Sequence, residues 1–63
     1  MYGILSLIGK KFGKDAMRRV LAITQNFPDD RFVRSMKNPN IADSSRLGAA
    51  EGLLSNASKY LTA

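Results

Sequence analysis

The sequence predicts an all-α protein of two or three short amphipathic helices, and three observations lead to that prediction. Apolar residues recur at helical spacing through the first 27 positions, with basic residues on the other side. Helix start and stop signals surround a short segment over residues 28–37. Over residues 44–61, apolar residues recur at alternating intervals of three and four positions. A chain of 63 residues forms one domain with a marginal core. We therefore expect a helical hairpin or a small bundle that partners complete.

The single domain over residues 1–63 divides into four predicted segments. They are a cationic amphipathic helix in 1–27, a short helix in 28–38, a turn at 39–43 and a small-residue-rich helix in 44–63.

The first helix is predicted over residues 4–26. At about 100° per residue its apolar side chains share one side, which we expect to be an apolar docking face. That face comprises Ile4, Leu5, Ile8, Phe12, Ala16, Val20 and Ile23. The opposite side and its flank carry Lys10, Lys11, Lys14, Arg18 and Arg19. Gly9 and Gly13 each cost about 1 kcal/mol relative to Ala, so they either weaken this helix or mark a close approach of another helix or surface.

The second helix is predicted over residues 28–37. Phe27 is expected to end the first helix, because a residue that precedes proline is disfavoured in the helical region. Pro28 suits the first position of the next helix, and Asp29 and Asp30 suit its first turn, where the helix dipole favours anions.

The third helix is predicted over residues 44–61, after a turn at 39–43 that is rich in turn-forming residues. Asp43, Ser44 and Ser45 are candidate caps for its start. Apolar residues at alternating intervals of three and four predict a narrow helix-packing seam, formed by Leu47, Ala50, Leu54, Ala57 and Leu61. Small residues surround the seam, so this helix buries little apolar area by itself and is expected to pack on a partner or a second copy.

The sequence contains no Cys and no His, which excludes disulfides and the usual zinc and haem ligands. Ser44 and Ser45 have no base to activate them, and Asp29 and Asp30 are neighbours that cannot face each other on a helix. We therefore expect no catalytic residue, no cofactor, no metal and no small-molecule substrate, and the chain is predicted not to be an enzyme.

The net charge is +5, and five of the ten basic residues lie in the first 27 positions against one acid, Asp15. Such a cluster attracts phosphates of lipid headgroups or of nucleic acids, although it is also typical of a solvated face that keeps a small protein soluble. Lipid or protein is favoured over nucleic acid, because apolar residues lie opposite the lysines and aromatic residues are not interleaved with them.

The leading functional hypothesis is a small non-enzymatic structural or interaction protein, a minor component of a larger assembly such as a virion or a membrane complex. Protein partners or self-association are expected, with an anionic membrane surface as a further partner. One alternative is a membrane-active cationic peptide, since the N-terminal stretch resembles leaderless bacteriocins and virus-entry segments in composition and amphipathicity. A further alternative is a small protein that binds or packages nucleic acid.

No transmembrane segment is predicted, because the uncharged opening run over residues 1–9 is far shorter than the ~20 residues that a span needs. Positive charges follow this run instead of preceding it, so it is not expected to be a secretory signal. We expect synthesis inside the cell, and a final location at a virion or membrane stays open.

Overall fold

A computed structural model describes residues 3–61, and this part of the chain is helical with no strand. The predicted all-α class is confirmed. The helices are α1 (Ile4–Phe12), α2 (Lys14–Asn26), α3 (Arg31–Lys37), α4 (Asp43–Ser55) and α5 (Ala57–Leu61).

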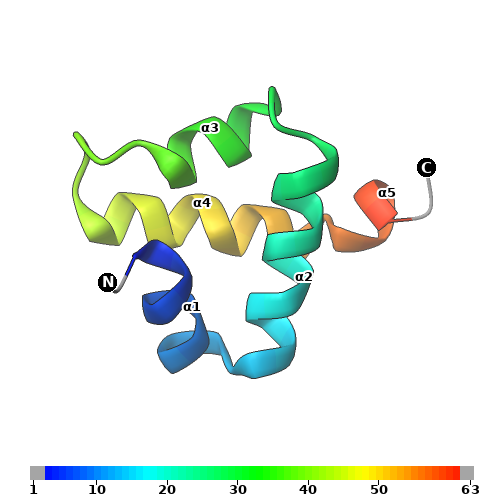
Figure 1. Cartoon of the computed structure of the whole chain (residues 1–63), viewed down its shortest axis with the longest axis horizontal. Helices are drawn as coiled ribbons and strands as arrows, with labels where there is room; N and C mark the ends of the chain where they lie inside the picture. Colours follow the sequence, from blue (N-terminus) through cyan, green and yellow to red (C-terminus); the bar gives the residue numbers. More distant parts are fainter. Residues whose placement is uncertain (1–2, 62–63) are drawn as a thin grey trace.

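Helix α4 lies at the centre of the arrangement (Figure 1). Helix α3 packs along one side of α4, whereas α1 and α2 pack against it from the other side and also against each other. Helix α5 continues beyond the end of α4 and contacts α2. The described body measures 30 × 23 × 19 Å.

The prediction of a single helix over residues 4–26 is wrong, because the helix is interrupted at Gly13. Gly13 has φ +98°, a backbone conformation that residues other than glycine rarely adopt. Its N–H still donates to the carbonyl of Gly9 (3.0 Å), and its own carbonyl accepts from Met17 N–H (3.1 Å), so it ends α1 and begins α2. Gly9 marks a close approach within the chain, since a Cβ there would lie 3.1 Å from the sulfur of Met17.

Helix α3 begins later than predicted, because Asp30 is its N-cap and not a residue of its first turn. The Asp30 carboxylate accepts hydrogen bonds from the N–H groups of Phe32 (2.9 Å) and Val33 (3.2 Å). These bonds satisfy two donors that a helix start leaves without partners. The end of α3 at Lys37 agrees with the prediction.

The helix predicted over residues 44–61 is also interrupted, at Asn56. The Asn56 side chain donates to the carbonyl of Gly52 (2.8 Å) and so competes with the helical backbone pattern. At the other end, Ala42 is the N-cap and no side chain caps α4. Asp43 forms an ion pair with Arg46 instead (3.6 Å).

The core contains nine buried apolar residues: Ile4, Ile8, Val20, Ile23, Val33, Met36, Ala49, Ala50 and Leu53. The first four of these belong to the predicted apolar docking face, so that face is turned inward and is not displayed to a partner. Of its other members, Leu5 and Phe12 pack partly buried against the core, and Ala16 is half-buried. The break at Gly13 allows this arrangement, because it brings α1 back onto α2 and α4.

The packing seam of α4 differs in register from the prediction. Leu53 and Ala49 are buried although they lie outside the predicted seam, whereas the seam residue Leu61 is 48% exposed. The remaining seam residues are buried or half-buried against this chain's own core: Leu47, Ala50, Leu54 and Ala57. Only Leu21 and Leu61 are large exposed hydrophobic residues within residues 3–61. The described helices therefore cover their core without a partner helix.

The contact between α3 and α4 depends on glycine at one position. A Cβ placed on Gly52 would lie 2.9 Å from Cε1 of Phe32, closer than packed atoms allow. A Cβ on Gly48, one turn earlier in α4, would meet nothing within 4 Å.

These two glycines make a matched pair of substitutions. Gly52→Ala should destabilise the chain by about 1–3 kcal/mol, because the Phe32 ring must move out of a packed position. Gly48→Ala should instead stabilise it by about 0.5–1 kcal/mol through higher helix propensity. Urea denaturation followed by circular dichroism measures both, and equal effects of the two substitutions would contradict the close α3–α4 contact.

Candidate anion-binding surface

The basic residues predicted to contact an anionic surface lie in the last turn of α1 and the first half of α2. We name this set the cationic corner: Lys10, Lys11, Lys14, Arg18 and Arg19. All five are exposed. The inner sides of both helices are buried through residues such as Ile8 and Val20, so helical periodicity places the charged residues outside. The turn at Gly13 joins α1 to α2 (Figure 1), and basic residues lie on both sides of this turn in the sequence.

The cationic corner has no acidic partner. The ion pair between Arg46 and Asp43 is the only one within 4 Å among residues 3–61. The exposed Asp15 is the acid nearest to the corner in sequence, and it pairs with none of the five. Lys11 Nζ lies 5.7 Å from the ring centroid of Phe12, a contact that leaves its charge in place. Five like charges so close together repel one another, and an external anion relieves that repulsion.

The structure separates this corner from the apolar residues that the sequence placed opposite it. Four of those residues lie in the core and the other three are half-buried. Leu21, 38% exposed, is the one large exposed hydrophobic residue of α1 and α2. None of the helices within residues 3–61 has the length and apolar character needed to cross a membrane. The corner therefore displays charge with little apolar surface beside it.

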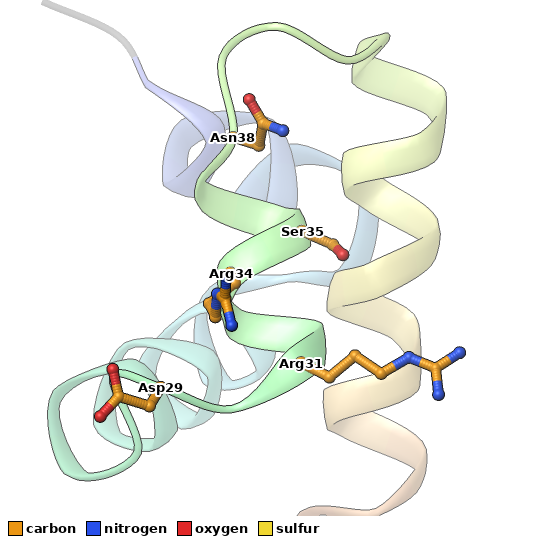
Figure 2. Close-up of a pocket in the computed structure, with 5 residues that line it drawn as sticks. All are labelled: Asp29, Arg31, Arg34, Ser35 and Asn38. Atoms are coloured by element: carbon orange, nitrogen blue, oxygen red, sulfur yellow. The ribbon is translucent and has the colours of Figure 1, made fainter.

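A shallow hollow of about 530 Å³ lies over α3. Its lining residues are Asp29, Arg31, Arg34, Ser35 and Asn38. Figure 2 shows their polar groups pointing in different directions instead of converging on one point. The Asn38 side chain is already engaged, because its oxygen accepts from Asn40 N–H (2.9 Å). The hollow is therefore not a preformed site for a small ligand, although it does carry two exposed arginines.

These arginines are a feature that the sequence analysis missed. Arg31, Arg34 and Lys37 follow one another every three residues and are all exposed. The signal was present in that spacing, but Asp29 and Asp30 nearly balance their charge when it is summed over the segment.

A second hollow, of about 620 Å³, lies at the start of α1. Apolar side chains such as Leu5 and Met17 line it together with Lys37 and Arg46. Arg46 is already engaged, since its Nε donates to the carbonyl of Met36 (2.8 Å) and its guanidinium pairs with Asp43. Lys37 is then the one cation among the lining residues without an ion pair, and a single cation does not define an anion site.

Asp30 and Tyr60 form the one titratable pair with clearly shifted pKa values. The Tyr60 hydroxyl donates to Asp30 (2.7 Å), and its ring packs edge-on against Phe27 with centroids 5.2 Å apart. Burial alone would raise the pKa of Asp30, but hydrogen bonds from Tyr60, Val33 and Phe32 outweigh burial and lower it. Burial raises the pKa of Tyr60, and the neighbouring carboxylate raises it further.

Both shifts favour the protonation states that these groups already have at neutral pH. An acid–base catalyst needs a pKa near the working pH, so the pair is a structural clamp between α5 and the start of α3. Among residues 3–61, no group of three or more acidic side chains is placed to hold a metal ion.

Comparisons with protein-family models, with curated proteins and with solved structures gave no match to this chain. Its function is therefore inferred from its own residues.

The clamp can be tested through Tyr60→Phe, which removes the hydrogen bond but keeps the ring contact with Phe27. We expect a loss of about 1 kcal/mol in unfolding free energy at pH 7. The pKa of Asp30 is lower in the folded than in the unfolded chain, so its stabilisation is present above about pH 4 and is lost as the pH falls through the lowered value. Tyr60→Phe weakens this lowering and should reduce the loss of stability in acid.

Urea denaturation between about pH 7 and pH 2 measures both effects. Asp29→Asn is the matched control, because Asp29 is exposed and makes no hydrogen bond or ion pair in the described chain. It should leave stability within about 0.5 kcal/mol. An identical acid profile for Tyr60→Phe and the unmodified chain would contradict the clamp.

Proposed function

We propose that this chain is a small non-enzymatic interaction protein that docks on an anionic surface of a larger assembly through the cationic corner. One observation supports the proposal: five exposed basic residues follow one another through the last turn of α1 and the first half of α2, and among residues 3–61 no acidic side chain pairs with any of them within 4 Å. Virions and membrane complexes both offer surfaces of this kind.

The proposed docking is electrostatic, and its affinity is the sum of several weak contacts. A basic residue near an anionic bilayer contributes about 1 kcal/mol, and each neutralised phosphate of duplex DNA adds about 0.9 to the salt dependence of binding on a logarithmic scale. Such binding needs no apolar contact. This mode of binding agrees with the structure, because apolar side chains of α1 and α2 such as Ile8 and Val20 are buried in the core.

Docking on a surface is favoured over insertion into a membrane. Insertion needs a displayed apolar face, and Ile8, Val20 and Ile23 have no exposed surface in the folded chain. A membrane-active peptide would have to open this core first, at a cost in buried apolar area.

The test neutralises part of the corner with Lys10→Gln, Lys11→Gln and Lys14→Gln, which lowers the net charge from +5 to +2. Affinity for anionic vesicles or for duplex DNA should fall by about 10- to 100-fold at low salt, because three favourable contacts are lost. The logarithmic salt slope for DNA should decrease by about 2 to 3. Vesicle co-sedimentation and fluorescence anisotropy measure the two affinities.

A charge-matched control carries Arg31→Gln, Arg34→Gln and Lys37→Gln, and its net charge is also +2. It should retain most of the affinity, since the cationic corner is intact. Equal losses in the two variants would mean that net charge alone governs binding. The absence of binding to either anionic probe by the unmodified chain would also refute the proposal.

A further inference from the structure

The chain carries a second cationic surface, which is separate from the corner. We name it the α3 face: Arg31, Arg34 and Lys37. These three side chains are exposed, whereas Val33 and Met36 of the same helix are buried in the core. Arg31 and Arg34 line the hollow over α3, and Lys37 lines the hollow at the start of α1. No acidic side chain lies within 4 Å of the three cations.

The helices that carry the two cationic surfaces lie on opposite sides of the central helix. Helix α3 packs on one side of α4, and the junction of α1 and α2 lies beyond the other side (Figure 1). The fully buried core residues, among them Leu53, Ile8 and Met36, fill the space between them. The body is 23 Å across in its second dimension, so α3 and the α1–α2 junction lie at two edges of a small molecule.

We propose that the chain bridges two segments of duplex nucleic acid, with the corner on one segment and the α3 face on the other. This inference rests on the proposed docking function and names its partner. Duplex DNA carries one charge per about 1.7 Å of its axis, so separate segments can supply phosphates to both surfaces. A bilayer presents a single plane, whereas α3 and the α1–α2 junction lie on opposite sides of α4.

The aromatic residues favour a duplex over a single strand. Proteins that bind single strands stack bases on exposed aromatic rings. Within residues 3–61 every aromatic side chain is half-buried, namely Phe12, Phe27, Phe32 and Tyr60. The Tyr60 ring is further occupied by Phe27 and its hydroxyl by Asp30. Contacts are therefore made to the duplex backbone, without dependence on sequence.

Bridging has a characteristic dependence on concentration. A bridge requires one protein molecule to be shared by two duplexes, so bridging rises while protein is scarce. Excess protein then occupies each duplex separately and the bridges dissolve. Simple charge neutralisation by the corner alone gives binding without this maximum.

The experiment mixes two populations of short duplexes, one with a donor dye and one with an acceptor dye, and adds the full chain at low salt. Energy transfer between duplexes reports bridging, and anisotropy of one labelled duplex reports binding. We expect energy transfer to rise and then fall as protein is added. Both signals should disappear at high salt.

Two charge-matched variants separate the surfaces. Arg31→Gln, Arg34→Gln and Lys37→Gln together should keep the affinity for one duplex within about threefold but abolish energy transfer. Lys10→Gln, Lys11→Gln and Lys14→Gln together should lose both signals. The variant with Arg31→Lys and Arg34→Lys keeps the charge and should bridge like the unmodified chain. Circular dichroism verifies that each variant retains its helices.

The outcomes distinguish this inference from the docking proposal. Binding of the unmodified chain to duplexes without energy transfer overturns bridging and leaves docking standing. Binding to anionic vesicles but not to duplexes does the same, because the partner is then a lipid surface. Undiminished bridging by the α3-face variant also overturns the inference, since self-association of the chain then joins the duplexes. Failure to bind either probe removes both proposals.

Discussion

The close approach of other helices to α4 is the constraint on which the fold depends. A chain of 63 residues without cysteine has no disulfide to compensate for a small core, so its helices must pack closely around a shared element. Ala49 and Ala50 are buried in α4, and Gly52 lies directly under the Phe32 ring. These small residues bury little area themselves. They let α3 approach from one side and α1 with α2 from the other, so that larger side chains on those helices are covered.

This inward packing also explains the distribution of charge. Once α1 and α2 turn their apolar sides to α4, their basic residues have only solvent to face, and the same holds for the arginines of α3. The most exposed chemistry of the described chain is thus cationic, in two places that the core holds apart. The interaction function proposed above depends on charge, whereas the buried apolar residues stabilise the chain itself.

Helical periodicity predicted the fold class and the exposure of the corner lysines and arginines, while their contact with an anion stays a prediction. It could not predict the break at Gly13, because a glycine is tolerated inside a helix and only the tertiary gain from burying Ile4 and Ile8 decides against it. It also gave the wrong register for α4. A helix that is packed on two sides also buries residues outside a single seam, such as Leu53.

Asp30 serves two helices at once, because one carboxylate oxygen caps α3 and the other accepts from Tyr60 in α5. Residues 30 positions apart are thereby tied to a single acidic group. The last helix and the first turn of α3 consequently depend on the same group, although they are far apart in the sequence. Protonation of that carboxylate therefore weakens both the N-cap of α3 and the hydrogen bond to α5.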